Sequence, residues 1–141
     1  MSDMHDWNTS IIEEFRANEG RVGNMFEGAP MVLITTTGAK TGKTRVNPLM
    51  CLPEGDTIVI FASAGGAPNS PAWFHNIVAN PTITVEYGTE TFTAQAEVAA
   101  RSERDRLYAI QAERYPQFAE YETETTRTIP VVVLHRAAVT P

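Results

Sequence analysis

The chain has 141 residues, 43% hydrophobic and 20% charged, which fits one folded domain over residues 1–141 and excludes a disordered chain. Its formal net charge of -6 and its sequence pI near 5.0 exclude a general affinity for nucleic acid, because phosphates would then need a local cluster of cations. No stretch approaches the roughly 18 apolar residues of a membrane span, and "MSDMHDW" is too acidic for a secretory signal, so we expect a cytoplasmic protein without stable membrane insertion.

Residues 1–20 are predicted to form an amphipathic helix that ends at Gly20. Its apolar face consists of Trp7, Ile11, Ile12 and Phe15. Its polar face is acidic, through Glu13, Glu14 and Glu19. We therefore expect the apolar face to cover the protein's own sheet, with a peripheral membrane contact as the alternative. The helix could equally serve as a contact between two copies of the chain.

"MVLITTT" and "RVNPLMCL", residues 31–37 and 45–52, are predicted to be the two strands of a hairpin whose turn runs from Gly38 to Lys43. A nucleotide-binding phosphate loop is excluded, because three residues rather than four separate Gly38 from Gly42, and a proline follows where a helix should begin. Three of the eleven cations of the chain lie in or beside this turn: Lys40, Lys43 and Arg45. A solvated turn is the ordinary interpretation, but this density of cations also allows an anion site.

"TIVIFAS", residues 57–63, predicts a third strand beside the first two. The loop "AGGAPNS" follows, and we expect Ser70 to cap a short helix that has Pro71 at its first position and ends at Pro81. Free N–H groups at the start of this helix suit an anion or an oxygen-rich ring. A plain connector between strands is an equally weighted alternative.

Two further strands, "TITVEYG" and "ETFTAQAEVAA", are predicted to form a hairpin through Gly88. We expect Ser102 to cap the next helix, with Asp105 as the acid of a capping box, and Tyr115 and Pro116 to end it. A brief helical or coiled segment and a last strand "VVVLH" follow. Six strands joined mainly by tight turns predict an α+β fold with a six-stranded antiparallel barrel. The lack of a β-α-β rhythm excludes a Rossmann fold.

Residue patterns for hydrolysis or metal binding are missing from the sequence. His5, His75 and His135 do not have the spacing of metal ligands, and no Gly-x-Ser-x-Gly motif is present. Cys51 is the only cysteine, so no disulfide forms within the chain and we expect this residue to be buried. Aromatic residues are available for a flat apolar slot, although at these spacings they are more often core: Trp73, Phe74, Tyr115, Phe118 and Tyr121. Such a slot would suit a cofactor that carries its own reactivity.

Three blocks carry a resemblance to a known family: "LITTTGAKTGKTRVNPLMCL", "VIFASAGGAPNSPAWFHNIVANP" and "RYPQFAEYETETTRTIPVVVL". They occur in this order between about Met31 and Leu134, and together they resemble the deazaflavin-dependent nitroreductase family of actinobacteria. The resemblance implies a split β-barrel like that of FMN-binding proteins and the use of coenzyme F420, an 8-hydroxy-5-deazaflavin. It also implies hydride transfer to a small-molecule acceptor, in a type of barrel that often forms homodimers.

The resemblance further implies which residues bind the cofactor. Lys40 and Arg45 would hold its phosphate and its oligoglutamate tail, assisted by Thr41, which agrees with the chemistry of both cations. The remaining contacts lie in three short segments: Val46, Asn47 and Pro48 along the cofactor; Ala62, Ser63, Ala64 and Gly65 beside the ring; and Ala72, Trp73 and Asn76 on the other side.

On the acceptor side, Tyr115 and Tyr121 match substrate-side tyrosines of the family and are expected to donate hydrogen bonds to developing negative charge on the acceptor. Met50 and Phe118 stand where nitroimidazole-reducing members carry tyrosines, so two hydroxyls are missing. We therefore expect hydride transfer to an apolar conjugated acceptor such as a quinone, with nitro compounds reduced slowly or not at all. Two alternatives stay open: an FMN-dependent split-barrel oxidoreductase and a non-catalytic F420 carrier.

Overall fold

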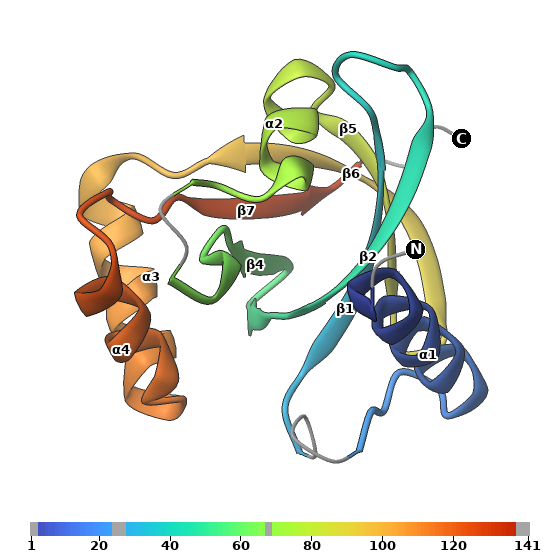
Figure 1. The fold of residues 1–141 in the computed structure, drawn as a ribbon, viewed down its shortest axis with the longest axis horizontal. Coiled ribbons are helices and arrows are strands. Elements are labelled where there is room, and N and C mark those ends of the chain that lie inside the picture. Colours follow the sequence, from blue (N-terminus) through green and yellow to red (C-terminus); the bar gives the residue numbers. More distant parts are fainter. Residues whose placement is uncertain (1–2, 24–27, 67–68, 138–141) are drawn as a thin grey trace.

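The computed structural model describes residues 3–23, 28–66 and 69–137 (Figure 1). Its helices are α1 Asp3–Ala17, α2 Ala72–Ala79, α3 Arg101–Arg114, α4 Gln117–Glu124 and the short 3-10 helix η2 Ala64–Gly66. Its strands are β1 Met31–Thr37, β2 Thr44–Met50, β3 Leu52–Glu54, β4 Thr57–Phe61, β5 Thr82–Tyr87, β6 Glu90–Val98 and β7 Val131–Arg136. All strand pairs are antiparallel, in one curled sheet of order β2-β1-β5-β6-β7-β4-β3. The fold class is therefore α+β, as predicted.

The two edge strands of the sheet, β2 and β3, are separated in the chain by Cys51 alone. One residue spans only about 3.8 Å, whereas each strand of a flat sheet adds about 4.8 Å of width, so the sheet must curl until its edges meet. Cys51 is buried at this junction, and its N–H donates to the carbonyl of Pro30 at 3.0 Å. The described part of the chain therefore has seven strands where six were expected, because the second expected strand divides at Cys51.

The pairing of β4 differs from the prediction of a third strand beside the first two. β4 pairs with β3, the end of the second expected strand, and with β7 from the C-terminal part of the chain, whereas β1 has β5 as its second neighbour. Both predicted hairpins, β1–β2 and β5–β6, are present. Turn chemistry thus predicted the local pairs, and the closure of the sheet decides the distant ones.

Alternate residues of β4 contribute to two apolar clusters on opposite faces of the sheet. Ile58 and Ile60 belong to the inner cluster, which the curl encloses and which includes Trp73 of α2. Val59 and Phe61 belong to the α3–α4 cluster on the outer face. The other buried members of the α3–α4 cluster are Leu52, Leu107, Tyr108, Phe118, Ile129 and Val131. In Figure 1, α1 and the α3–α4 pair lie on opposite sides of the molecule, with α2 near one end of the sheet.

Helices α3 and α4 are held together by buried polar contacts. The Tyr108 hydroxyl donates to the carbonyl of Phe118 at 2.7 Å. The buried Arg104 guanidinium donates to the carbonyl of Ile129 at 2.9 Å and binds the Glu122 carboxylate at 2.8 Å. Because each of these buried polar groups has a partner, the helices are fixed to each other and to the chain that leads into β7.

The start of α3 differs from the predicted cap. The N–H of Arg104 donates to the carbonyl of Ala100 at 2.7 Å, so the first turn closes before Ser102, and the helix begins at Arg101. Asp105 does not complete a capping box but forms ion pairs with Arg101 and Arg104. The predicted break after this helix is present, since α3 and α4 are separate helices.

The predicted N-terminal helix is present as α1 and packs on β1 and β2 through Ile11 and Phe15. The side chain of Trp7 lies outside what the structure describes. Arg16 binds both carboxylate oxygens of Glu86 in β5, at 3.0 and 2.8 Å, and so joins the helix to the sheet. The rest of the α1 cluster is Val22, Met31 and Leu33, with Ile12, Val46 and Met50 packed against it. Over the described residues, no helix has the length and hydropathy needed to cross a membrane.

Gly20 follows α1 with a φ of 94°, and a Cβ at this position would lie 2.8 Å from the Cα of Gly88. Gly20→Ala is expected to lower the free energy of unfolding by about 2–4 kcal/mol, through backbone strain and steric overlap. Gly55→Ala is the control, because Gly55 also has a positive φ but a Cβ added there would meet no atom within 4 Å. Strain alone should cost about 1–2 kcal/mol at Gly55. Equal losses of unfolding free energy in the two variants, measured by urea denaturation, would contradict the close approach of Gly20 to Gly88.

Candidate functional site

The turn between β1 and β2 presents cations to solvent. The N–H of Gly38 donates to the carbonyl of Lys43 at 2.7 Å, and the N–H of Gly42 donates to the carbonyl of Gly38 at 3.0 Å. The Thr41 hydroxyl accepts a further bond from the N–H of Lys43 at 3.2 Å. The predicted hairpin turn is therefore confirmed, and Lys40, Thr41 and Lys43 are exposed on it.

The cations in and beside this turn have no carboxylate partners within the described part of the chain. Five arginines elsewhere form ion pairs with aspartate or glutamate: Arg16, Arg101, Arg104, Arg106 and Arg136. Lys40, Lys43 and the exposed Arg45 have no ion pair among the residues that the structure describes. In a chain with 17 acidic residues and 11 lysines and arginines, three unpaired cations together create a local positive potential that favours an anion.

The strand register places Arg45 on the same face of the hairpin as α2. Arg45 lies opposite Thr36, and residues paired across strands point to the same face. The Thr36 hydroxyl accepts a hydrogen bond from Asn76 of α2 at 3.2 Å, which identifies that face. Asn47 lies opposite Ile34, a residue of the inner cluster, and therefore shares the face with Arg45.

Val46 and Pro48 point to the opposite face of β2. Val46 packs against the α1 cluster, and Pro48 lies opposite Leu33, a buried member of that cluster. The three consecutive residues predicted to run along the cofactor therefore do not share one face. A ligand lying along the edge of β2 can contact residues of both faces, whereas a ligand lying flat on one face cannot.

Asn76 joins α2 to the cationic turn. Its side chain is 9% exposed, and its Oδ1 accepts a hydrogen bond from the N–H of Ala39 at 3.0 Å. One helical turn later, the exposed Asn80 donates to the carbonyl of Thr37 at a longer 3.4 Å. The amide of Asn76, predicted as a cofactor contact, thus binds the turn that carries Lys40.

The first residues of α2 differ in exposure. Ala72 is exposed, whereas Trp73 is only 5% exposed because its ring packs in the inner cluster. The expected cap by Ser70 is wrong: the N-cap position is Pro71, without a side-chain cap. The Ser70 hydroxyl is instead bound by Arg127 at 3.2 Å.

The segment after β4 is engaged with the C-terminal part of the chain. The N–H of Ala62 donates to the carbonyl of Pro130 at 2.9 Å. The carbonyls of Ala62 and Ser63 accept hydrogen bonds from Arg127 at 3.1 and 3.0 Å. Ala64 is exposed with a φ of 47°, a left-handed conformation that is uncommon outside glycine and that concentrates at functional sites.

The short helix η2 lies directly against α4. Gly65 and Gly66 belong to η2, and Gly66 has a φ of 85°. A Cβ on Gly66 would lie 2.8 Å from a carboxylate oxygen of Glu124 and 3.4 Å from the Cα of Tyr121. The predicted ring-side segment and one of the predicted acceptor-side tyrosines are therefore neighbours.

The four residues predicted on the acceptor side gather around the α3–α4 cluster. Phe118 is 5% exposed within it, with its ring centroid 5.2 Å from that of Tyr121, and Tyr115 packs at its edge. Met50 packs against both this cluster and the α1 cluster. Gln117 approaches the Met50 sulfur at 3.8 Å. The structure thus places Phe118 mainly in the core and leaves the two tyrosines half-buried.

Four of these contacts are made by two residues that the sequence did not single out. Arg127 reaches groups 57 to 65 residues earlier in the chain, and Gln117 reaches Met50 across 67 residues. Neither residue belongs to a local motif, so only the fold reveals them. Cys51 is buried, which raises the pKa of its thiol to about 12 and leaves it protonated and unreactive.

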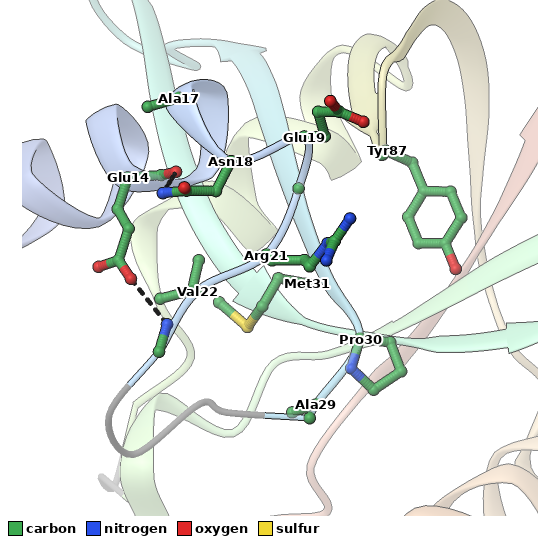
Figure 2. A pocket seen from close by; sticks show the side chains of 14 residues that line it. Glu14, Ala17, Asn18, Glu19, Arg21, Val22, Ala29, Pro30, Met31 and Tyr87 are labelled. Carbon is green, nitrogen blue, oxygen red and sulfur yellow. Dashed lines mark hydrogen bonds between the residues drawn. The ribbon is translucent and has the colours of Figure 1, made fainter.

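Two cavities lie apart from these residues. One of about 960 Å³ opens beside the C-terminal end of α1, between Glu14, Met31 and Tyr87 (Figure 2). The other, of about 400 Å³, lies between α3 and the sheet and includes Glu97 and His135. None of the predicted site residues lines either cavity. Within the described ranges, no group of three or more His, Cys, Asp or Glu side chains is arranged to hold a metal ion.

Comparisons with known proteins agree on one family. The family described as F420H(2)-dependent quinone reductase matches residues 7–136. An F420H(2)-dependent quinone reductase of Mycobacterium tuberculosis is 40% identical over 126 residues, covering 86% of this chain and 85% of that protein. A solved structure of an F420-H2 dependent reductase (FDR-A) is 42% identical with a TM-score of 0.69, covering 75% of this chain and 94% of its own. A further solved structure, described only as a domain-swapped dimer, is 38% identical with a TM-score of 0.71, covering 94% of this chain and 98% of its own.

Asn76→Ala is expected to lower the free energy of unfolding by about 2–3 kcal/mol, because it leaves the N–H of Ala39 and the Thr36 hydroxyl without their partner. Asn80→Ala is the matched control on the same helix, since it removes one long, exposed hydrogen bond. It should change stability by less than about 0.5 kcal/mol. Urea denaturation of both variants measures the difference; similar losses would show that Asn76 does not fix the turn.

Proposed function

The chain belongs to the F420H(2)-dependent quinone reductase family, and on this premise we propose that the β1–β2 turn, η2 and α4 together form its cofactor and acceptor site. The chain is an oxidoreductase that depends on reduced coenzyme F420. The alternatives of an FMN enzyme and of a non-catalytic carrier find no support in these relatives, which are named as F420H2-dependent reductases.

The observation that carries this proposal is the group of unpaired cations in the turn. Coenzyme F420 has a phosphate and an oligoglutamate tail, so the residues that hold this arm must offset negative charge. We assign Arg45 to this arm because its guanidinium can bind an oxyanion with two parallel hydrogen bonds, and Lys40 because its ammonium adds a point charge. The exposed Thr41 hydroxyl lies beside them on the turn. The residues present therefore fit an anionic arm.

We assign the ring side of the cofactor to Ser63, Ala64 and Gly65. Small side chains let a flat ring approach the backbone closely, and Ala64 already has the left-handed conformation typical of such sites. When bound, the reduced deazaflavin supplies the hydride. The chain supplies orientation and shields the ring from water.

The other predicted cofactor residues take lesser parts in this assignment. Asn47 shares a face with Arg45, and Ala72 is exposed at the start of α2, so both can contact the cofactor. Trp73 and Asn76 are buried, and we assign them supporting parts, under the ring side and under the turn. Val46 and Pro48 can contact the cofactor only along the edge of β2.

We propose that the acceptor is an apolar, conjugated molecule such as a quinone. Support comes from the Mycobacterium tuberculosis relative, which is named as a quinone reductase, and from the apolar surroundings of the acceptor side. Met50 and Phe118 provide an apolar wall without hydroxyls, so nitro compounds are expected to be reduced slowly or not at all. Tyr115 and Tyr121 are the hydroxyl donors for the charge that develops on the acceptor.

Two finer features of the architecture belong to the same proposal. We interpret the curled sheet, whose edges meet at Cys51, as a split β-barrel. We also propose a homodimer, supported by the 38% identical structure that is described as a domain-swapped dimer. Light scattering after size-exclusion chromatography distinguishes a mass of one chain, 15.5 kDa, from that of two.

Arg45→Ala should weaken the binding of coenzyme F420 by about 1.5–3 kcal/mol, because a hydrogen bond between charged groups is lost. The loss should shrink at high salt, since this contact is exposed. Arg21→Ala is the control. Arg21 is also exposed and has no ion pair among the described residues, but it lines the cavity beside the C-terminal end of α1. Quenching of the cofactor's fluorescence gives both affinities. Unchanged binding in Arg45→Ala would place the anionic arm elsewhere.

Tyr115→Phe and Tyr121→Phe should lower kcat/KM for menadione by about tenfold to a hundredfold if the altered hydroxyl stabilises charge in the transition state. Cofactor affinity should stay the same. Tyr87→Phe is the control and should keep full activity, because Tyr87 packs against the inner cluster and does not belong to the α3–α4 cluster. Oxidation of the reduced cofactor is followed by absorbance. Full activity in both Tyr115→Phe and Tyr121→Phe would remove these residues from the acceptor side.

A further inference from the structure

Arg127 connects three segments of the proposed site. It lies in the connection between α4 and β7, and its Nη2 donates to the carbonyls of Ala62 and Ser63 at 3.1 and 3.0 Å. Its Nη1 donates to the Ser70 hydroxyl, just before α2, at 3.2 Å. Burial lowers the pKa of this guanidinium, but arginine stays protonated at physiological pH. A half-buried charged group therefore holds the chain that leads from β4 to α2.

The bonds from Arg127 determine where two backbone N–H groups point. In a trans peptide the carbonyl and the following N–H point in opposite directions. The Ala62 carbonyl faces Arg127, so the N–H of Ser63 faces away from it, and the same relation holds for the Ser63 carbonyl and the N–H of Ala64. The structure records no hydrogen-bond partner for either N–H within its described ranges. Two adjacent donors are thus presented on the side away from Arg127.

The segment from Ala62 to Gly66 is also held at its C-terminal end. The N–H of Gly66 donates to the Ser63 carbonyl at 2.9 Å, and Gly66 packs against Tyr121 and Glu124 of α4. Between these two constraints lies Ala64, with its left-handed φ of 47°. A conformation of this kind persists only where the surrounding structure enforces it. Arg127 and the contact of Gly66 with α4 are the two groups that enforce it.

We propose that Arg127 is a positioning residue for the redox ring: by binding the carbonyls of Ala62 and Ser63, it directs the N–H groups of Ser63 and Ala64 at the oxygen-bearing edge of the deazaflavin. This inference rests on the proposed cofactor site and assigns different roles to two of its arginines. Arg45 binds the anionic arm of the cofactor directly. Arg127 does not touch the cofactor and acts through the backbone that binds the ring.

The roles of the two arginines are distinguished by measuring how two ligands bind to the purified protein, without any turnover. One ligand is coenzyme F420, and the other is its deazaflavin nucleoside, which has the ring but lacks the phosphate and the glutamate tail. Arg127→Met keeps the length of the side chain and removes its donors. We expect Arg127→Met to weaken the binding of both ligands by a similar factor, about tenfold, because the binding of each depends on the ring. Arg45→Ala should weaken coenzyme F420 alone.

Arg104→Met is the matched structural control. Arg104 also binds a backbone carbonyl of the connection before β7, that of Ile129, but makes no recorded contact with the segment after β4. Its loss should lower Tm but weaken the binding of either ligand much less than Arg127→Met does when binding is measured well below Tm, because Arg104 reaches the segment after β4 only through α4. If Arg127→Met lowers Tm but keeps full affinity for both ligands, the proposal is wrong.

Arg127→Lys covers the case in which Arg127→Met does not fold. Lysine keeps the charge, but its single ammonium cannot bind the two carbonyls and Ser70 in the geometry of the guanidinium. We expect a folded protein with affinity for the nucleoside reduced severalfold; unchanged affinity would overturn the proposal. Added guanidinium ion should restore part of the affinity in Arg127→Met and none in Arg104→Met. If Arg45→Ala also binds coenzyme F420 normally, the proposed site itself is wrong, which differs from failure at Arg127 alone.

Discussion

Continuity of the chain at Cys51 is the constraint on which the rest of the structure depends. Because β2 runs into β3 through one residue, the first and last strands of the sheet must lie together, and the curl encloses the inner cluster. The outer face is then shared by α1 and the α3–α4 pair. Met50, the residue before the junction, contacts the clusters under both. β2 leads from the turn that carries the cations to this junction, and β4, which pairs with β3, leads from it to η2.

The β1–β2 turn differs from the rest of the molecule in its electrostatics. Elsewhere five arginines are paired with carboxylates, as in the contacts of Arg106 with Glu54 and Glu103. Exposed pairs of this kind contribute little to stability, typically about 0–1 kcal/mol. Leaving Lys40 and Arg45 unpaired therefore loses little stability in the folded chain. The unpaired cations create a positive potential, which an overall acidic protein needs if it is to attract an anionic cofactor.

The sequence predicts what local chemistry controls. The glycine turns at Gly38–Lys43 and at Gly88 specify both hairpins, and alternation of side chains specifies which residues are buried. It does not predict the break at Cys51 or the pairing of β4 with β7, since these depend on contacts far apart in the chain. The cap predicted at Ser70 failed for a related reason: its hydroxyl is bound by Arg127, 57 residues later. Family resemblance supplied the residues predicted to bind the cofactor, but the contacts that hold these residues in place became visible only in the fold.

Two locally unfavourable features of the described chain lie within the proposed site, and a third lies on α3. Ala64 has a left-handed backbone, three neighbouring cations lack partners, and both amide atoms of the fully buried Gln111 have none. Gln111 lies on the inner face of α3, and its carbonyl accepts the N–H of Tyr115. An unsatisfied buried amide costs about 1–3 kcal/mol, and a left-handed alanine costs about 1–2. Folding alone selects against such features, so a left-handed Ala64 and unpaired cations among the residues assigned to the cofactor are what selection for binding would leave.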